Sequence, residues 1–360
     1  MSLTVRIRKK LSHFTLTADF SAADHFTCLL GASGSGKSML LKCIAGLETP
    51  DEGYIELNGR VLYDSEKKID IRPQNRSVGY LFQNYALFPH MTVRKNIAAA
   101  AKDPAEVDFF LERFCIQDVA DQYPAELSGG QSQRTALARM LVTKPEVLLL
   151  DEPFSALDNY MRTRMEHEIL DILEEFRGPS VLVTHDRNEA YRLADRIGVM
   201  EAGNIVETQD RRAFFDHPMT VAAARLTGCK NISALKKDAD GAWLAEDWGI
   251  RLKPVEGQDF ATADHVGYRA HFFKEISKEQ LQDTNCFRCR LERIVEDTFS
   301  VVICFTEENG TGETADALLT WIVDKTKWEE MKDRVLSGSF YLTLDPERLM
   351  LLKSNTPTQA

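Results

Sequence analysis

The stretch Phe26-Thr27-Cys28-Leu29-Leu30-Gly31-Ala32-Ser33-Gly34-Ser35-Gly36-Lys37-Ser38 decides the fold of the first part of the chain. Its first five residues are typical of a buried strand, and residues 37–45 repeat apolar side chains with helical spacing. The glycine-rich segment between them fits G-x-x-x-x-G-K-[ST], and a strand before it and a helix after it are the context that this phosphate-binding motif needs. The sequence therefore predicts an α/β P-loop nucleotide-binding fold.

The loop offers three kinds of group to a nucleotide. Its glycines let backbone N–H groups converge on an anion at a helix N-terminus. Those backbone donors belong to Gly31, Ala32, Ser33, Gly34, Ser35 and Gly36. Lys37 is placed to reach the β- and γ-phosphates, and the Ser38 hydroxyl is a candidate Mg²⁺ ligand. The alternative, a chance glycine-rich turn, does not require the flanking strand and helix.

Two carboxylates follow a second predicted buried strand, residues 147–150. One carboxylate at such a strand end suits the Mg²⁺ shell, which makes Asp151 a candidate metal ligand. The next residue, Glu152, is a candidate for polarising the attacking water. Two exposed acids at a strand end are the alternative, but the phosphate loop upstream favours the catalytic interpretation.

A second candidate anion site lies at residues 127–134, before a predicted helix over 135–142. Its donors come from Ser128, Gly129, Gly130 and Gln131. One nucleotide has no obvious way to contact both the phosphate loop and this second anion site of the same subunit. A symmetric dimer, in which each subunit lends its second cradle to the partner's nucleotide, removes this difficulty.

Composition narrows the class of protein further. The 360 residues include 44 Lys or Arg and 55 Asp or Glu, so the formal net charge is −11. This acidity argues against nucleic acid as a partner, because phosphate backbones require basic patches. No apolar run approaches the ~20 residues that a spanning helix needs. The seven scattered cysteines are interpreted as reduced thiols.

The chain is expected to divide into two domains, 1–228 and 229–360. All four tryptophans, Trp243, Trp248, Trp321 and Trp328, lie in the second part. In the first part, an Asn-Gly turn predicts a hairpin over 54–62. Residues 93–141 look mostly helical, and 181–183 reads as a further buried strand. In the second part, six strands are expected at 242–252, 266–273, 286–295, 300–305, 317–323 and 339–344, with a helix at 328–336, which indicates a small all-β barrel or sandwich.

The order of these motifs resembles the ATP-binding-cassette (ABC) ATPases, over residues 1 to about 230. The resemblance implies antiparallel β and helical subdomains, ATP and Mg²⁺ as ligands, and ATP hydrolysis. It makes Gln83 the glutamine that touches Mg²⁺ and the attacking water, Glu152 the general base, and His185 the switch histidine facing the γ-phosphate. It also makes residues 127–131 the family signature and places Asp158 in the D-loop. Taken alone, His185 would be read as an ordinary strand-end histidine.

One feature departs from the family pattern. An aromatic residue that stacks on adenine is usual about 25 residues before the phosphate-loop lysine. Phe14 is the nearest aromatic here, with His13 as the other candidate, and packing of Phe14 in the β-subdomain is the alternative. The choice between ATP and GTP therefore stays open at this point.

Residues 84–93 and 96–97 look like those of importer ATPases, where they form a groove for a helix of the membrane subunit. The segment from Tyr85 to Met91 is then the expected contact with membrane-spanning permease subunits, with exposed Tyr85, Leu87 and Phe88 lining it. A buried loop is the alternative. The resemblance further implies a homodimer, peripheral attachment at the cytoplasmic face of the cell membrane, and indirect cooperation with an extracytoplasmic solute-binding protein.

Within importers, residues 227–232, 247–249 and 267–271 look most like the molybdate, tungstate and sulfate group. That likeness implies a regulatory C-terminal domain of the oligomer-binding (OB-like, TOBE/MOP-like) type and an oxyanion as solute. Candidate anion-binding residues are Arg269, His271, Lys274, Arg288 and Arg290. Sugar, polyamine or iron import, and a soluble ABC switch without transport, are the alternatives. Cys286 and Cys289 form a lone C-x-x-C and are interpreted as incidental strand cysteines.

Overall fold

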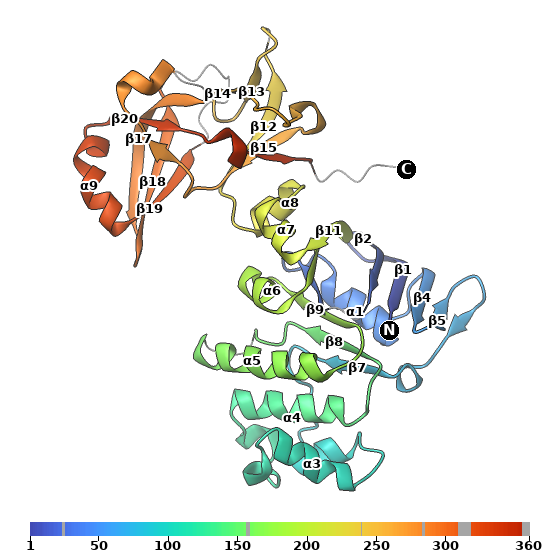
Figure 1. The fold of residues 1–360 in the computed structure, drawn as a ribbon. Coiled ribbons are helices and arrows are strands. Elements are labelled where there is room, and N and C mark those ends of the chain that lie inside the picture. The colour runs from blue at the N-terminus through green and yellow to red at the C-terminus, as the bar shows by residue number, and fades with distance from the viewer. Residues whose placement is uncertain (24–25, 156–158, 239, 283–284, 309–317, 355–360) are drawn as a thin grey trace. The chain divides into compact units, whose positions relative to one another are not determined.

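The computed structural model describes residues 1–23, 26–155, 159–238, 240–282, 285–308 and 318–354. The chain forms two compact units, Met1–Arg212 and Ala213–Ala360 (Figure 1). The expected boundary after residue 228 therefore lies inside the second unit. Within the described stretches, no helix combines the length and the apolar character needed to cross a bilayer.

An 11-stranded sheet is the framework of the first unit, with the order β6-β5-β4-β1-β2-β11-β10-β3-β9-β8-β7. Strands β3, β9, β8 and β7 are parallel to one another, and β10 is parallel to β3 but antiparallel to β11, which in turn is parallel to β2. Strands β1, β2, β4, β5 and β6 pair antiparallel with one another. Every residue of β3, β8 and β9 is buried, as expected of parallel strands covered on both faces. The strands are β1 (Leu3–Lys10), β2 (Thr15–Ala22), β3 (Phe26–Leu30), β4 (Glu52–Leu57), β5 (Arg60–Asp64), β6 (Ile69–Asp70), β7 (Val78–Leu81), β8 (Val147–Asp151), β9 (Ser180–Thr184), β10 (Arg196–Glu201) and β11 (Asn204–Asp210).

The helices of this unit are α1 (Lys37–Ala45), α2 (Val93–Ala98), α3 (Ala105–Arg113), α4 (Gly129–Leu141), α5 (Asn159–Glu175) and α6 (Arg187–Leu193). Helices α1 to α4 lie in segments that were expected to be helical, whereas α5 and α6 were not expected. Figure 1 shows α3 and α4 grouped at one end of the unit and the β4–β5 hairpin at another. The hairpin turn has φ 53° at Asn58 and 80° at Gly59, which confirms the predicted Asn-Gly turn.

The parallel strands decide where chemistry can occur. β3, β9, β8 and β7 are neighbours in that order, so their carboxyl ends meet at one edge of the sheet. Ligands of open α/β sheets bind at this edge. The residues that follow these strands are the phosphate loop, His185, the Asp151–Glu152 pair and Gln83. The topology thus brings together residues that lie up to about 150 positions apart in sequence.

The second unit contains two five-stranded sheets, in the orders β14-β13-β12-β15-β21 and β16-β20-β17-β18-β19. Five aromatic side chains, Phe273, Phe287, Phe305, Phe340 and Trp321, pack through stacked or edge contacts in its core. The strands are β12 (Asn231–Lys237), β13 (Trp243–Ala245), β14 (Ile250–Leu252), β15 (His265–Tyr268), β16 (Lys274–Glu275), β17 (Cys286–Glu296), β18 (Ser300–Glu307), β19 (Leu319–Asp324), β20 (Ser339–Thr343) and β21 (Met350–Leu352). The helices are α7 (Arg211–Asp216), which crosses the division between the units, α8 (Val221–Leu226) and α9 (Lys325–Leu336).

Helix α8 explains why packing places the division before residue 228. Val221 and Ala224 of this helix form one apolar cluster with Cys229, Met350 and Leu352. A helix that buries its apolar face against the strands of the second unit belongs to that unit.

Several details of the second unit differ from the sequence expectation, among them the short strands β16 and β21, which were not expected. The strand expected over 242–252 is a tight hairpin of β13 and β14, with Gly249 at φ 67°. Strand β12 was not expected, because polar residues occupy its inward positions and hide the apolar alternation. Asn231 and Ser233 there are 2% and 1% exposed, and the Asn231 amide donates to the carbonyls of Tyr268 and Thr320.

Candidate active site

The lysine of the glycine-rich loop donates hydrogen bonds to carbonyl groups of the same loop. Lys37 begins α1 and is only 4% exposed, and its Nζ donates to the carbonyl oxygens of Gly31 and Ala32 at 2.8 and 2.9 Å. Burial lowers the pKa of Lys37, while the nearby carboxylates of Glu152 and Asp151 act in the opposite direction. The ammonium group is therefore desolvated and poised beside two acids.

Three features of the loop fit an anion. A Cβ at Gly31 would lie 2.3 Å from the carbonyl oxygen of Met200, so no larger residue is tolerated there. Gly36 caps α1 with φ 104°, a conformation that favours glycine and turns the first N–H groups of the helix outward. The hydroxyl of Ser35 is buried and has no hydrogen-bond partner among the described residues. Hydrogen-bond donors without a protein partner at the start of a helix are the groups that bind phosphate.

The two principal candidate metal ligands meet directly. Ser38 Oγ donates to Asp151 Oδ1 at 2.7 Å, and the hydroxyl of Tyr80 donates to Asp151 Oδ2 at 2.8 Å. Asp151 is 4% exposed at the end of β8. Burial and the Asp151 carboxylate raise the pKa of Tyr80, so this phenol remains a donor. Sequence reasoning missed Tyr80, because nothing in β7 distinguishes it from a packing residue.

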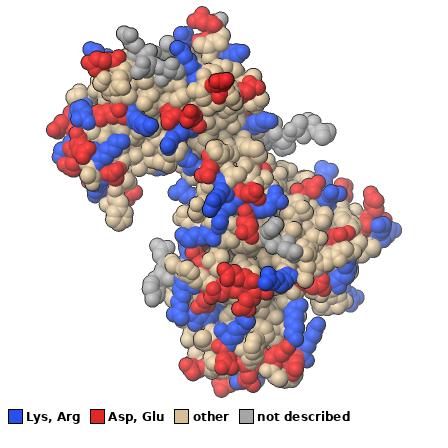
Figure 2. Space-filling model, viewed as in Figure 1, with Lys and Arg blue, Asp and Glu red and all other residues tan. Residues whose placement is uncertain are grey.

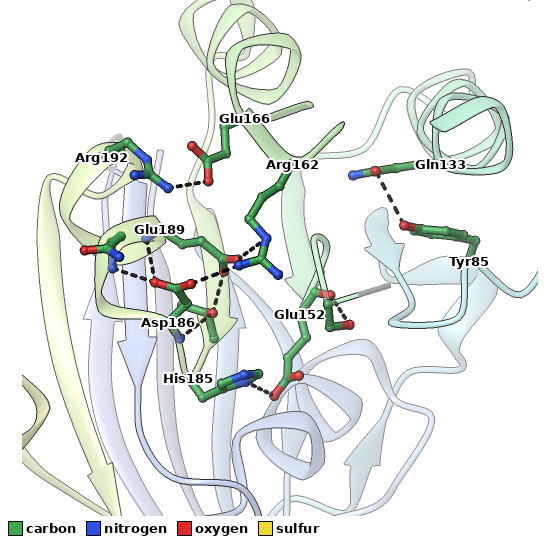
Figure 3. Close-up of polar contacts among 12 residues, drawn as sticks. Tyr85, Gln133, Glu152, Arg162, Glu166, His185, Asp186, Glu189 and Arg192 are labelled. Atoms are coloured by element: carbon green, nitrogen blue, oxygen red, sulfur yellow. Dashed lines mark hydrogen bonds and ion pairs between the residues drawn. The ribbon is translucent and has the colours of Figure 1, made fainter. Parts of the chain in front are cut away.

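The three candidate catalytic side chains also converge. Glu152 Oε1 lies 3.3 Å from His185 Nδ1, and Gln83 Nε2 donates to Glu152 Oε2 at 3.4 Å. Figure 3 shows His185 and Glu152 pointing toward one another from two neighbouring strand ends. Glu152 itself has φ 44°, a left-handed backbone that is unusual for this residue type and that aims its side chain at the partners. Gln83 is also the third candidate metal ligand.

The second cradle is a helix cap. Ser128 begins α4 with a capping box: its Oγ accepts from the Gln131 backbone N–H at 3.3 Å, and the Gln131 side chain accepts from the Ser128 N–H at 2.8 Å. A Cβ at Gly130 would lie 2.5 Å from Met161 Cε, and Gly129 is the first helical residue. Within the described residues, no hydrogen bond or ion pair joins residues 128–131 to residues 31–38.

Phe14 lies beside the phosphate loop. A Cβ at Gly36 would be 3.3 Å from its Cε2, and the ring also packs against the core of the first unit. This contact agrees with the alternative, packing of Phe14 against the core, and a role in stacking on a base stays a prediction. Asp158 of the expected D-loop lies outside the described residues.

A groove adjoins the site on the side of the helices. Its cavity measures about 550 Å³, and its lining includes Phe82, Ala86, Phe88, Ala99 and Arg139. Phe88 is 42% exposed and its ring lies 5.1 Å below the Arg139 guanidinium. Of the segment from Tyr85 to Met91, Ala86 and Phe88 line this groove, and its role as a contact for a membrane subunit stays a prediction.

The expected exposure of Tyr85 is wrong. Its side chain is 7% exposed, and its hydroxyl donates to the buried Gln133 of α4 at 3.5 Å (Figure 3). Left-handed φ values of 60° and 45° at Tyr85 and Ala86 turn the segment inward at this point. Leu87 is partly buried, so Phe88 is the most exposed of the three.

Several expected anion-binding residues of the second unit have protein partners. Arg269 donates to the carbonyl of Thr227 at 3.1 Å and to that of Phe215. Arg288 pairs with Glu308, Arg290 pairs with Glu292 at 2.8 Å, and Lys274 lies 3.9 Å from Asp345. Burial and the neighbouring Arg269 and Arg348 lower the pKa of His271. Because these basic side chains already contact protein groups, their geometry does not favour an oxyanion site.

The cysteines hold no cross-link. All seven are free, and along β17 Cys289 is fully buried whereas Cys286, an odd number of residues away, lies on the other face. Among the described residues, no group of three or more His, Cys, Asp or Glu side chains is placed to hold a metal ion. The interpretation as incidental strand cysteines agrees with this geometry.

Comparison with known proteins points to one family. The family model described as ABC transporter matches residues 18–155. The sulfate/thiosulfate import ATP-binding protein CysA of Thermosynechococcus vestitus is 43% identical over 261 residues, which cover 69% of this chain and 76% of that protein. The putrescine transport ATP-binding protein PotG of Escherichia coli is 43% identical over 248 residues, covering 66% and 64%. The molybdenum import ATP-binding protein ModC of Paramagnetospirillum magneticum is 36% identical over 222 residues, covering 60% and 61%.

Solved structures agree with the fold. The dimeric structure of the ATP-binding cassette MJ0796, in a post-hydrolysis state bound to ADP and Pi, superposes with a TM-score of 0.50 and 26% identity. It covers 59% of this chain and 99% of that protein. The chain spans roughly two thirds of the length of the curated relatives that it matches.

Proposed function

The chain belongs to the ABC transporter family, and from this premise we propose that it is the ATP-hydrolysing subunit of an importer, attached at the cytoplasmic face of the membrane. The observation that carries the proposal is the meeting of phosphate-binding, metal-binding and water-activating groups at one sheet edge. Those groups are Lys37, Ser38, Gln83, Asp151, Glu152 and His185.

Each group has a defined task in phosphoryl transfer to water. The backbone N–H groups of the loop and Lys37 hold the β- and γ-phosphates of ATP. Ser38, Asp151 and Gln83 offer hydroxyl, carboxylate and amide oxygens, the donor types that Mg²⁺ prefers. Mg²⁺ held there would neutralise the charge on the phosphate oxygens.

Water activation falls to Glu152. Its carboxylate is held between Gln83 and His185, so its direction is set by two hydrogen-bonding neighbours. A carboxylate held in this way orients the water and accepts its proton, while His185 and Gln83 face the reacting phosphate. Phe14, beside the loop, is our candidate for stacking on adenine.

Steady-state hydrolysis tests the activity. We expect the purified chain to hydrolyse Mg-ATP, and Glu152→Gln to lower kcat on the order of a hundredfold or more while nucleotide binding persists. Hydrolysis by Glu152→Gln at the wild-type rate would show that Glu152 is not the general base. Lack of any ATPase in the wild-type chain, alone and with its membrane partner, would refute the proposed function.

The working form that we propose is a homodimer. Ser128, Gly129, Gly130 and Gln131 form a second helix start, which lacks hydrogen bonds to the phosphate loop among the described residues of the same chain. In a symmetric dimer each cradle covers the nucleotide of the other subunit. The similar MJ0796 cassette, whose dimeric structure holds ADP and Pi, supports this arrangement.

The partner that we propose for the groove is a permease subunit. An apolar groove of about 550 Å³ with an exposed Phe88 suits a short amphipathic helix of a membrane protein. Acidic and basic side chains are interspersed over the face shown in Figure 2, which suits neither DNA nor RNA. An extracytoplasmic solute-binding protein would deliver solute to that permease without touching this chain.

The solute class that we propose is a small oxyanion such as sulfate or molybdate. The names of similar proteins, CysA and ModC, support it, and PotG makes a polyamine the competing solute. Residues 229–360, the part of the second unit after α8, would then form a regulatory β-domain of the OB-like, TOBE/MOP-like type, and we propose residues 1–228 as the ATPase domain. Stimulation of ATPase in the reconstituted complex by sulfate or molybdate, and not by putrescine, is the expected result. Stimulation by putrescine alone would overturn the assignment.

A further inference from the structure

A second charged cluster lies behind His185, away from the residues that sequence reasoning identified. Asp186 is the N-cap of α6, and its Oδ1 accepts from the backbone N–H groups of Asn188 and Glu189 at 2.7 and 3.4 Å. Glu189, one turn into this short helix, is 4% exposed. Two carboxylates are thus held close together next to the candidate switch histidine (Figure 3).

Arg162 of α5 faces both carboxylates. Its NH1 lies 3.2 Å from Asp186 Oδ2, and its Nε lies 3.9 Å from Glu189 Oε1. Burial raises the pKa of Glu189, the Asp186 charge raises it further, and Arg162 lowers it. The neighbouring Arg192 is paired with Glu166 at 2.6 Å instead. Among the described residues, Arg162 is therefore the cation in ion-pair distance of both acids, while Arg192 acts on them from farther away.

The cluster is joined to the backbone on both sides of His185. Thr184 Oγ1 donates to Glu189 Oε2 at 2.5 Å and accepts from the Asp186 backbone N–H at 3.0 Å. Arg162 also lines a small cavity of about 70 Å³ together with Glu152 and His185. The turn that carries His185 is thus fixed by groups that Arg162 neutralises.

We propose that Arg162 is a positioning residue for His185, which holds the turn 184–186 so that the imidazole faces Glu152. The inference rests on the proposed ATPase function and adds a residue to it. Arg162 belongs to α5, whereas His185 follows β9, so the contact also ties the helix after the Glu152 segment to the switch turn. Loss of this cation leaves two adjacent carboxylates without this ion-pair partner, and the turn that they hold shifts.

Steady-state kinetics of full-length variants tests the proposal. We expect Arg162→Gln to lower kcat about tenfold to a hundredfold, the range for a misplaced catalytic group, with KM for Mg-ATP nearly unchanged because the phosphate loop is intact. Arg162→Lys restores most of kcat. Arg164→Gln, an exposed arginine of the same helix that pairs with Glu168, is the matched control and keeps the wild-type kcat. Wild-type kcat in Arg162→Gln overturns the proposal.

A double variant separates positioning from simple stability. Arg162→Gln leaves the buried Glu189 carboxylate without its ion-pair partner, which lowers stability, and Glu189→Gln in the same chain removes that buried charge. A positioning role predicts that Arg162→Gln/Glu189→Gln recovers the wild-type melting temperature but keeps a low kcat. Recovery of kcat together with stability would overturn the proposal. A wild-type chain without ATPase activity would instead refute the proposed function, so the two failures are distinguishable.

Discussion

At the scale of single residues, Lys37 is the group whose environment is most tightly defined. Its ammonium is buried, bonded to two carbonyls of its own loop and attracted by Asp151 and Glu152. The attraction between such a desolvated cation and a phosphate is strong, because water does not screen it.

Replacement of Lys37 tests this environment. Lys37→Ala is expected to weaken nucleotide binding by on the order of a hundredfold, since one charge-assisted contact to phosphate is lost. Titration with a fluorescent ATP analogue measures the dissociation constant. Lys67→Ala, an exposed lysine paired with Asp64, is the control and should bind as the wild type does. Equal affinities of the two variants would contradict the assignment.

Glu307 gives the second unit a pH dependence. It is partly buried, its Oε2 has no hydrogen-bond partner among the described residues, and burial raises its pKa from the ordinary 4.5 to about 7. The folded state therefore binds this proton more tightly than the unfolded state does. The stabilisation is complete below pH 4.5 and is lost as the pH rises to about 7.

We predict that Glu307→Gln prevents the decrease in stability that the wild type shows as the pH rises. At pH 8 the variant should be more stable than the wild type by about 1–2 kcal/mol, a shift of one pKa unit being worth about 1.4 kcal/mol before the discount for partial exposure. All four tryptophans lie in the second unit, so their fluorescence follows its unfolding. Glu296→Gln, on the same hairpin, is the control. Identical pH profiles of wild type and Glu307→Gln would disprove the prediction.

Much of the site could be predicted from sequence, because its residues come from local motifs. Ser38 contacts Asp151, and Glu152 contacts His185, so residues assigned to the metal and to the phosphate from separate motifs lie together, while their roles stay predictions. Tyr80 and Arg162 could not be found in this way, since their roles depend on which strand or helix packs beside the motif. The exposure of Tyr85 was wrong because two left-handed residues, which no local pattern announced, turn its side chain inward.

At the scale of elements, α4 owes its start to one serine. Ser128 forms the capping box of α4 and is also the proposed contact to the partner's nucleotide. The two roles make different demands, because a cap requires only an acceptor oxygen, whereas a phosphate contact requires a donor without negative charge.

Two substitutions separate these roles. Ser128→Ala should lower the free energy of unfolding by about 1 kcal/mol through loss of the cap. Ser128→Asp should keep the stability, since aspartate caps well, but should abolish ATP-dependent dimerisation because it repels phosphate. Chemical denaturation and size-exclusion chromatography with Mg-ATP measure the two effects. Dimerisation of Ser128→Asp at wild-type nucleotide concentrations would contradict the second cradle.

Elements were predictable where burial dominates their pattern. The continuous apolar runs of β3, β8 and β9 and the helix α1 were placed almost to the residue. Strand β12 was missed because buried Asn231 and Ser233 bond to backbone groups rather than pack as apolar residues. Tertiary hydrogen bonds of this kind leave no periodic signal in the sequence.

At the scale of the whole molecule, transport requires that the conformational change driven by ATP hydrolysis be transmitted to a permease. The groove lined by Ala99 and Phe88 lies in the same unit as the catalytic groups and is built from the segment that follows Gln83. Movement of that segment during hydrolysis would therefore reach a helix seated in the groove.

Blocking the groove should uncouple the two activities. Ala99→Arg is expected to leave the ATPase of the isolated chain within about twofold of the wild type, because no catalytic group is touched, but to abolish co-purification with the permease. Ala105→Arg, an exposed alanine outside the groove, is the control. Normal co-purification of Ala99→Arg would show that the permease binds elsewhere.

We propose that two chains enclose ATP between the phosphate loop of one and the second helix start, residues 128–131, of the other. The most direct test of this arrangement is the mass of Glu152→Gln in solution, measured by light scattering with and without Mg-ATP. This variant should bind ATP without hydrolysing it, so we expect a monomer that becomes a dimer only when Mg-ATP is present. A Glu152→Gln protein that binds ATP with full occupancy and remains a monomer would contradict it.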